Sequence, residues 1–412
     1  MSGMQDPELF MVGRAHRTSA NRRRVCRTPE KRLFPMQQTA RRIPHCLPLR
    51  LCALRRAMAN KKLDAFLIIH PTDLAYFTEF DGEDSLGLVT DKGLTIMTDF
   101  RFDEQAHIQA PWFKRIIRKG TMNEVLAKAF GQAKVRRVGF EANHLTVGAL
   151  LGIEKEMAGR KLRHTKLLPV TGITADIRKI KDSHEIGLVR QAVKIAEDAF
   201  DAVRRSLKPG MTENQLTGLL DLEVRNRGGS GMGFPSIVCV GENASLCHYR
   251  PGEVPVRSGA VLLIDWGAVC QGYTSDMTRT LLIGKVSPRM REIYKIVLEA
   301  QQAGIDRIRP GVTGKEVDLA ARNVIKKAGF GKYFGHSIGH GIGRLVHESP
   351  FMRSTKGAAV EELKAGMIVT VEPGIYLPGE GGVRIEDDVL VTQTGHEVLG
   401  SMPRDMAWAE VA

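Results

Sequence analysis

The alternation of hydrophobic and polar residues predicts an α/β unit in the first part of the chain. Leucine and methionine recur at near-helical spacing from near Leu49 to Leu63, and an apolar strand over residues 65–69 follows. Residues 86–97 indicate a hairpin that turns at residues 91–93. A strand over residues 135–140 and a helix over residues 147–157 complete this unit.

A polar stretch from Arg178 to Glu185 separates this unit from the rest of the chain. Since 412 residues exceed one ordinary core, we expect a smaller N-terminal α/β domain over residues 48–180 and a second domain over residues 181–412. The second domain begins with a helix whose apolar residues lie on one face at three- and four-residue spacing. These residues are Ile186, Val189, Val193, Ala196, Phe200 and Val203.

A weak internal repeat marks the second domain. The sequence LKPGMT at residues 207–212 returns as IRPGVT at residues 308–313, an offset of 101 residues. In each copy a Pro-Gly turn precedes a predicted capping box, in which the threonine and a later Gln or Glu satisfy the exposed amides of a helix start. Each copy also follows a predicted helix, so the repeat indicates a pseudo-symmetric α/β domain of two related halves. Coincidence is the alternative, because Pro-Gly-x-Thr is common at helix starts.

The composition, 43% hydrophobic and 26% charged residues, is that of an ordinary globular protein. No run approaches the roughly 18 consecutive apolar residues of a membrane-spanning helix, so we expect no membrane partner. The six cysteines form no CxxC pair and no regular framework. This usage favours a reducing compartment, and we expect a cytoplasmic protein.

The net charge of +14 is concentrated at the N-terminus. Residues 1–50 hold eleven Lys or Arg against three acids, which leaves +6 for the other 362 residues. Such a surface lacks a focused basic stripe, so we expect no nucleic-acid partner. The basic, aperiodic residues 1–47 are either a targeting segment, a disordered arm or the product of a start site assigned too far upstream, and organellar targeting stays open.

The candidate chemistry lies after residue 235, where acids and histidines occur in apolar, strand-like surroundings. Asp265 ends a run of four apolar residues, a place where a carboxylate is costly to bury without a compensating charge. Asp276 follows eleven residues later. The intervening Gly267, Gly272 and Tyr273 suit a hairpin that brings the two carboxylates face to face. A solvated hairpin is the alternative.

Residues 335–348 contain three histidines among glycines. His336 and His340 are four residues apart, as in a helical zinc motif, but four glycines in nine residues argue against a helix. An extended or looped ladder of histidines that includes His347 is the better interpretation. The glycines also resemble a phosphate-binding loop, but the preceding strand, the following helix and the lysine of such a loop are missing.

Two further acids end apolar strands, Glu372 after residues 367–371 and Glu386 after residues 382–385. Each could be a salt-bridged core residue, and Arg384 is an obvious partner for Glu386. Four carboxylates and a histidine in one domain instead favour a metal site, because two divalent cations offset four converging negative charges. Oxygen-rich ligation with one imidazole suits manganese, cobalt or zinc. Two such metals hold a bridging water, lower its pKa and polarise a scissile carbonyl.

At these residues the chain resembles the pita-bread metallopeptidases of family M24, which include methionine aminopeptidase, aminopeptidase P and prolidase. The resemblance begins near residue 48 and includes a smaller creatinase-like N-terminal domain before the pseudo-symmetric pita-bread domain. The family order of metal ligands falls on Asp265, Asp276, His340, Glu372 and Glu386, with spacings that resemble the Xaa-Pro branch. The resemblance implies hydrolysis of the bond between an N-terminal residue and proline through a hydroxide bound to two metals, with manganese expected before cobalt or zinc.

The resemblance also implies how the ligands divide between the metals. Asp276 and Glu386 would bridge the two ions, and Asp265 would bind one of them. His340 and Glu372 would bind the other. The family alone also implies a homodimer.

Further roles are implied for residues around the metals. Glu372 would move the proton of the hydroxide. Three histidines that are not ligands, His248, His336 and His347, would line the substrate pocket, and His248 and His347 would take part in catalysis by stabilising the tetrahedral intermediate. Arg384 would hold the carboxylates from the second shell around the metals.

Departures from the family patterns bear on the activity. Creatinase and non-catalytic binding members have lost metal ligands, and all five are present here. Methionine aminopeptidases, the other enzymatic alternative, usually lack the N-terminal domain. Many dipeptidases carry an Arg where this chain has Phe351, which cannot hold a peptide's terminal carboxylate. We therefore expect Xaa-Pro-Yaa tripeptides to be cleaved at least as well as Xaa-Pro dipeptides, with Arg353 as an alternative anchor.

Overall fold

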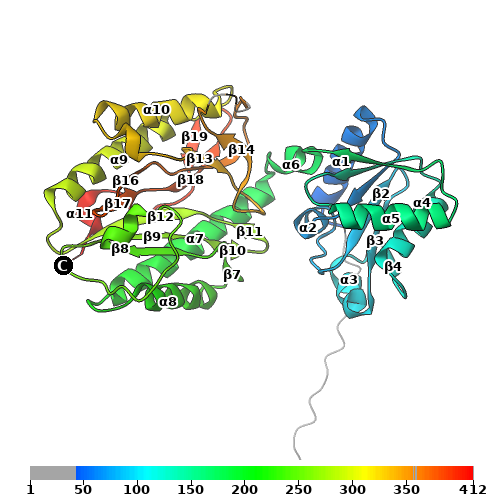
Figure 1. Cartoon of the computed structure of the whole chain (residues 1–412), viewed down its shortest axis with the longest axis horizontal. Coiled ribbons are helices and arrows are strands. Elements are labelled where there is room, and N and C mark those ends of the chain that lie inside the picture. The colour runs from blue at the N-terminus through cyan, green and yellow to red at the C-terminus, as the bar shows by residue number, and fades with distance from the viewer. Residues whose placement is uncertain (1–42, 356, 358–359, 412) are drawn as a thin grey trace, which may run out of the picture. The chain divides into compact units, whose positions relative to one another are not determined.

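The computed structural model of the protein describes residues 43–355, 357 and 360–411 (Figure 1). The predicted extension over residues 1–47 lies almost entirely outside these ranges, and its three interpretations stay predictions. The predicted domain boundary near residue 180 likewise stays a prediction. Among the helices in the described ranges, none has both the length and the apolar character that a membrane crossing requires.

The N-terminal part of the described chain contains a six-stranded mixed sheet with the order β4-β3-β2-β1-β5-β6. Its strands are β1 (Ala65–Ile68), β2 (Leu86–Thr90), β3 (Leu94–Thr98), β4 (Lys114–Ile117), β5 (Arg137–Glu141) and β6 (Lys166–Val170). Its helices are α1 (Cys46–Asn60), α2 (Pro71–Thr78), α3 (Asp103–Gln109), α4 (Met122–Ala133), α5 (Val147–Gly159) and α6 (Ile173–Arg178). The predicted hairpin is the antiparallel pair β2 and β3, and the predicted helices are α1 and α5.

The central strand β1 explains the apolar run in the sequence, because both faces of the strand are buried. Phe66 and Ile68 pack into one hydrophobic cluster, which includes residues of α1 and α2. Ala65 and Leu67 point the other way, into a cluster that includes residues of α4 and α5. Helices therefore cover this sheet on both faces, as the unbroken apolar pattern of β1 requires.

The second part of the chain contains two main sheets, with the orders β20-β12-β9-β8 and β14-β13-β15-β18-β19. The strands of the first are β8 (Ile237–Val240), β9 (Val261–Trp266), β12 (Met277–Ile283) and β20 (Glu410–Val411). The strands of the second are β13 (Gly339–Gly341), β14 (Glu348–Met352), β15 (Ile368–Val371), β18 (Asp387–Val391) and β19 (His396–Val398). Smaller sheets join β7 (Gly231–Met232), β10 (Ala268–Cys270) and β11 (Tyr273–Thr274), and β16 (Gly374–Leu377) with β17 (Gly381–Arg384).

Two pairs of helices enclose these sheets, with α7 and α8 on one side and α9 and α10 on the other (Figure 1). The helices are α7 (Ser183–Ser206), α8 (Glu213–Asn226), α9 (Pro288–Arg307), α10 (Gly314–Lys327) and the short α11 (Met406–Ala409). Alternate residues of β9 face the two sides. Val261 and Leu263 lie in the hydrophobic cluster around α9 and α10, and Leu262 and Ile264 lie in the cluster around α7 and α8.

The two copies of the sequence repeat adopt the same local structure. Thr212 and Thr313 are the N-caps of α8 and α10, and both form the predicted capping box. Gly210 and Gly311 precede them with φ values of 88° and 83°, a left-handed conformation that glycine adopts without strain. Each copy also pairs with a later extended segment, Thr212 with residue 255 and Thr313 with residue 362. The correspondence therefore extends beyond the residues that the sequence pattern matched.

Candidate metal centre

The first two candidate ligands lie on a hairpin, as the sequence predicted. Asp265 is near the end of β9, and its backbone lies opposite Thr278 of the antiparallel neighbour β12. Asp276 directly precedes β12. Because side chains alternate along a strand, Asp276 and Thr278 share a face, which is the face that carries the other carboxylates.

Glu386 reaches this face from the connection between β17 and β18. Its backbone forms an isolated bridge with Thr278, whose carbonyl accepts a hydrogen bond of 3.1 Å from the Glu386 amide. The Thr278 hydroxyl donates to Glu386 Oε2 at 2.7 Å. Thr278 therefore fixes one oxygen of this carboxylate and leaves the other for a different partner.

His340 lies in the middle of β13, in extended backbone as predicted for the glycine-rich segment. A side chain on the flanking Gly339 or Gly341 would place its Cβ 2.0 Å from Thr370 O or 2.2 Å from Ser349 O. Only glycine allows the neighbouring strands to approach β13 so closely. The Nδ1 of His340 lies 3.1 Å from the Gly341 carbonyl, so Nδ1 carries the proton and Nε2 presents a lone pair.

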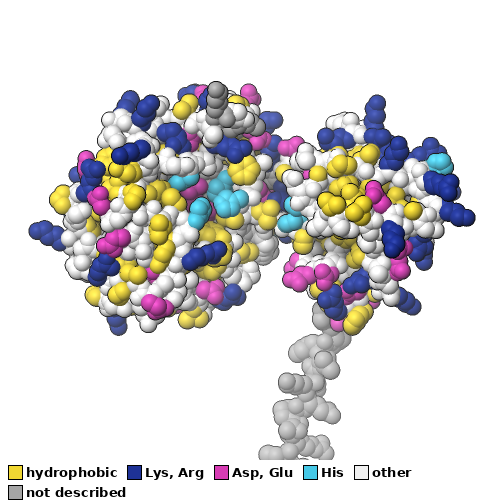
Figure 2. Space-filling model, in the orientation of Figure 1, with side chains coloured by type: hydrophobic (Ala, Val, Ile, Leu, Met, Phe, Trp, Pro, Cys, Tyr) yellow, Lys and Arg dark blue, Asp and Glu magenta, His cyan; other side chains and the backbone are white. Residues whose placement is uncertain are grey.

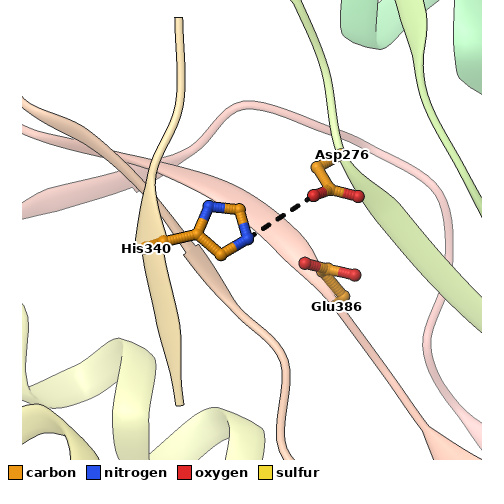
Figure 3. Close-up of side chains that lie close together, drawn as sticks. All are labelled: Asp276, His340 and Glu386. Atoms are coloured by element: carbon orange, nitrogen blue, oxygen red, sulfur yellow. Dashed lines mark ion pairs between the residues drawn. The ribbon is translucent and has the colours of Figure 1, made fainter. Parts of the chain in front are cut away.

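Asp276, His340 and Glu386 converge from three segments that are far apart in the sequence (Figure 3). Each offers one ligand atom, and these atoms all lie within 4.8 Å of one another. Nε2 of His340 is 3.7 Å from Asp276 Oδ2 and 3.7 Å from Glu372 Oε1. Asp265 and Glu372 are outside the three-residue group, but all five predicted ligands line one cavity of about 340 Å³.

The carboxylates fit divalent cations better than they fit any protein partner. One oxygen of each of four buried acids has no hydrogen-bond partner among the described residues. These oxygens are Oδ1 of Asp265, Asp276 and Asp388, and Oε1 of Glu386. An unpaired buried carboxylate oxygen is costly, and metal ligation removes that cost. Asp388 is close to the group because its Oδ2 accepts a hydrogen bond of 3.1 Å from the Asp276 amide.

The pKa values that the protein groups alone give to the candidate ligands also favour a metal site. Burial, together with the neighbouring acids, raises the pKa of Asp276 and of Glu386 well above their usual ranges. Burial raises the pKa of Glu372 to about 8. Burial and the adjacent His347 lower the pKa of His340 to about 4, so its imidazole is neutral at neutral pH, as a metal ligand must be.

Arg384 does not form the ion pair with Glu386 that its sequence position suggested. Its Nη2 donates to Asp265 Oδ2 at 2.6 Å, and its Nε donates to Thr278 Oγ1 at 3.1 Å. Its Nη1 donates to the Tyr376 hydroxyl at 2.9 Å. The reason is the strand geometry, since Arg384 ends β17 and faces β9 and β12. Arg384 thus orients Asp265 directly and Glu386 through Thr278.

The three histidines that were not predicted as ligands all line the same cavity. His336 Nδ1 lies 2.8 Å from the Ser337 carbonyl, and its Nε2 lies 2.8 Å from the Tyr376 hydroxyl. The ring of His347 packs against that of His340 with 4.2 Å between centroids. Figure 2 shows histidine side chains gathered at one place on the drawn face of the second part of the chain.

Thr278 and Tyr376 belong to the site, and sequence analysis missed both. Thr278 follows Asp276 by two residues in a strand-like segment. Because side chains alternate along a strand, this spacing places both residues on one face and could have identified Thr278. Tyr376 is buried and contacts both Arg384 and His336. Neither of these residues is adjacent to Tyr376 in the sequence. No local pattern identifies such a residue.

Phe351 lines the cavity and is 44% exposed, directly opposite His340 on the neighbouring strand β14. Arg353 is also exposed, and its guanidinium carbon is 5.8 Å from the centroid of the Phe351 ring. Arg353 is not among the residues that line the cavity. Arg353, the alternative carboxylate anchor that the sequence suggested, therefore lies beside the cavity and does not line it.

Comparisons with known families match almost the whole described chain. Residues 187–393 match Metallopeptidase family M24. Residues 50–180 match the Creatinase/Prolidase N-terminal domain. An uncharacterized peptidase of Bacillus subtilis is 37% identical over 358 residues, which are 87% of this chain and 99% of that protein.

Solved structures of peptidases share the fold. The Xaa-Pro dipeptidase from Bacillus anthracis matches with a TM-score of 0.83 and 35% identity, over 87% of this chain and 99% of its own. The X-Pro aminopeptidase from Thermotoga maritima matches with a TM-score of 0.78 and 33% identity, over 85% of this chain and 99% of its own. One of these proteins is a dipeptidase and the other an aminopeptidase, so the likeness does not distinguish the two substrate lengths.

Proposed function

Because the chain belongs to metallopeptidase family M24, we propose that it hydrolyses the peptide bond between an N-terminal residue and proline, as an Xaa-Pro aminopeptidase or an Xaa-Pro dipeptidase. The observation that carries this proposal is the convergence of Asp276, His340 and Glu386, with Asp265 and Glu372 beside them, in one cavity. The similarity to Xaa-Pro peptidases over both parts of the chain supports the choice of proline.

We assign the ligands as the family order implies. Asp276 and Glu386 face one another across the centre and would hold both ions (Figure 3). Asp265 would hold one ion, and His340 with Glu372, whose nearest ligand atoms are 3.7 Å apart, would hold the other. When bound, two divalent cations acidify water and polarise the scissile carbonyl. Manganese is our first choice, with cobalt and zinc as alternatives, because the ligands are oxygens and one imidazole.

The side chains around the ligands then perform the remaining steps. Glu372 accepts the proton of the attacking water and passes it to the leaving proline nitrogen, because its carboxylate lines the cavity beside His340 and the other candidate ligands. His248 and His347 donate hydrogen bonds to the oxygen that becomes negative during attack. His336 is held by Tyr376 and lines the wall of the substrate pocket.

The cavity also has an apolar wall that suits a proline ring. Phe234, Pro235, Ile237 and Val346 line it together with the ligands. The alternative of a methionine aminopeptidase is disfavoured by the match of residues 50–180 to the Creatinase/Prolidase N-terminal domain. A non-catalytic binding module is disfavoured because all five candidate ligands are present and line one cavity.

A panel of peptides tests this function. Purified protein loaded with manganese, cobalt or zinc is incubated with Xaa-Pro, Xaa-Pro-Yaa and Met-Ala-Yaa peptides, and release of the N-terminal residue is measured. We expect cleavage of the proline peptides only, with tripeptides cleaved at least as well as dipeptides because Phe351 cannot bind a carboxylate. Cleavage of Met-Ala-Yaa, or of no peptide, would contradict the proposal, and Asp276→Asn is the inactive control.

We propose that the protein acts on peptides as a homodimer, as the family implies. From the cysteine usage, the charge distribution and the lack of a long apolar run, we also propose that it acts in the cytoplasm without a nucleic-acid or membrane partner. The reducing compartment agrees with the cysteines, since the five in the described residues are all free.

A further inference from the structure

Arg250 lines the candidate active-site cavity and has no assigned role. It belongs to the 241–252 loop, the segment from Gly241 to Gly252 that forms the first part of the connection between β8 and β9 and also carries His248. Two cationic Lys or Arg side chains line the cavity, Arg384 and Arg250. Arg384 is fully engaged with Asp265, Thr278 and Tyr376. Arg250 is exposed and forms no hydrogen bond or ion pair with the described residues, so its guanidinium is available to a ligand.

A buried carboxylate binds both ends of the 241–252 loop. Glu213, at the first position of α8, is 0% exposed. It accepts hydrogen bonds from the Val240 amide at 2.8 Å and the Gly252 amide at 3.0 Å, at the two ends of the loop. Asn243 and the Tyr249 hydroxyl donate to it at 2.9 Å and 3.0 Å. These bonds bracket Arg250 between two fixed neighbours, Tyr249 and Gly252, so its backbone is positioned before substrate binds.

The position of Arg250 suits the far end of a short peptide. The candidate ligands Asp276 and Glu386 are only 5% and 1% exposed, so the scissile bond is cut at the closed end of the cavity. Arg250 is at the exposed end. A residue after proline extends the substrate by up to about 3.6 Å towards that end. Phe351, also at this end, offers no charge, and Arg353 is outside the lining.

We propose that Arg250 binds the free C-terminal carboxylate of the peptide substrate and thereby selects short Xaa-Pro-Yaa peptides. The planar guanidinium donates two parallel hydrogen bonds to a carboxylate, which neither a histidine nor a phenylalanine can do. Arg250 is thus a specificity-determining residue of the site. This inference rests on the proposed Xaa-Pro peptidase function.

The test compares Ala-Pro-Ala with its C-terminal amide, using the manganese-loaded full-length protein. The unmodified enzyme is expected to prefer the free acid by about 10- to 100-fold in kcat/KM, the value of a charge-assisted bidentate contact. Arg250→Ala should bring that preference close to 1 by lowering kcat/KM for the acid, chiefly through KM, with little effect on the amide. Arg250→Lys should keep part of the preference, because lysine retains the charge and loses the fork.

Arg353→Ala is the matched control, since it removes an exposed arginine beside the same cavity. It should leave the preference unchanged. Arg353→Ala abolishing the preference while Arg250→Ala retains it would overturn the proposal and identify Arg353 as the anchor. Equal cleavage of acid and amide by the unmodified enzyme would also overturn it.

If neither peptide is cleaved, the proposed peptidase function is wrong. Carboxylate binding by Arg250 is then tested by measuring the affinities of the acid and the amide by calorimetry. Tighter binding of the acid that depends on Arg250 supports it, and equal binding contradicts it. Unchanged metal content and thermal unfolding of Arg250→Ala show that the variant is folded.

Discussion

At the residue scale, two of the candidate ligands, Asp265 and Glu386, share a simple arrangement, in which the protein fixes one carboxylate oxygen and leaves the other unpaired. Arg384 binds Oδ2 of Asp265, and Thr278 binds Oε2 of Glu386, while the second oxygen of each acid has no partner in the described residues. Hydrogen bonds of this kind orient a ligand and stabilise its ionised form. This is the arrangement expected of acids that bind cations.

His347 allows a test that distinguishes a metal ligand from a residue that donates a hydrogen bond during catalysis. It lines the cavity beside His340 but is absent from the group of converging ligand atoms. We expect His347→Ala to retain its metals and lose about 100- to 1000-fold in kcat, as when an electrophilic donor to a developing oxyanion is removed. Metal analysis and steady-state kinetics check both parts. If the variant lost its metals, the assignment of His347 would be wrong.

The raised carboxylate pKa values predict how pH affects the metal-free protein. The pKa of Glu372 is about 8 in the folded protein and close to its ordinary 4.5 when unfolded. Between these values the folded state holds the proton and the unfolded state does not, so stability falls as pH rises. Asp276 and Glu386 act in the same direction. The stabilising contribution of Glu372 is therefore present below about pH 4.5 and is lost as pH rises through about 8.

Thermal unfolding at pH 5 and pH 8 measures this effect. The metal-free protein is expected to have the lower transition temperature at pH 8. Manganese should raise the transition temperature more at pH 8 than at pH 5, because protons compete with the metal for the same oxygens. A metal-free protein that is more stable at pH 8 would show that the acids are not the dominant buried charges.

Sequence patterns predicted the candidate ligands and Arg384, but they did not predict Thr278, which orients Glu386. A carboxylate at the end of an apolar strand is costly to bury without a partner, and this pattern made Asp265, Glu372 and Glu386 candidates. The resemblance implied that Arg384 holds the carboxylates, and its sequence position suggested Glu386 as an ion-pair partner. Its contacts are instead 119 residues away at Asp265 and 106 residues away at Thr278. Such long-range pairing depends on how strands meet in space, which local periodicity does not encode.

At the scale of single elements, β13 shows why glycine was a reliable signal. Four glycines near His340 argued against a helix, and the structure shows a strand in close contact with both of its neighbours. The same elements that were strongly periodic in sequence, such as α7, were predicted near their observed bounds. The 241–252 loop had no such signal, because its order comes from Glu213, which precedes it by many residues.

Gly341→Ala tests the close approach at β13. The added Cβ would lie 2.2 Å from Ser349 O, a backbone atom that cannot move without separating β13 from β14. We expect a loss of about 1–3 kcal/mol in the free energy of unfolding. Gly335→Ala is the matched control, because nothing lies within 4 Å of its added Cβ. Chemical denaturation measures both variants, and equal stabilities would refute the packing argument.

At the scale of the whole molecule, the two halves that carry the sequence repeat both contribute to the candidate metal centre. Asp265 and Asp276 come from the first half, and His340, Glu372 and Glu386 come from the second. The β-bridge between Thr278 and Glu386 joins β12 of one main sheet to the residue that directly precedes β18 of the other. A centre divided in this way exists only when both halves are folded and packed together.

The predicted fold class is confirmed, with a creatinase-like N-terminal part and a pita-bread part that carries the candidate site. The sequence motif also identified the family correctly. These predictions succeeded because five spaced candidate ligands and two capped helix starts constrain the topology strongly. The length of the substrate depends on individual side chains at the exposed end of the cavity, such as Phe351 and Arg250, and no spacing rule determines how these bind a peptide.

The most direct test of the account is the metal content of the protein. After reconstitution with manganese or cobalt, elemental analysis is predicted to find about two ions per chain. Asp276→Asn should reduce binding at both positions, because one bridging carboxylate serves both ions, whereas Asp306→Asn, on the exposed end of α9, should retain two ions. Finding no divalent metal after reconstitution, or two ions in Asp276→Asn, would contradict the metal centre itself.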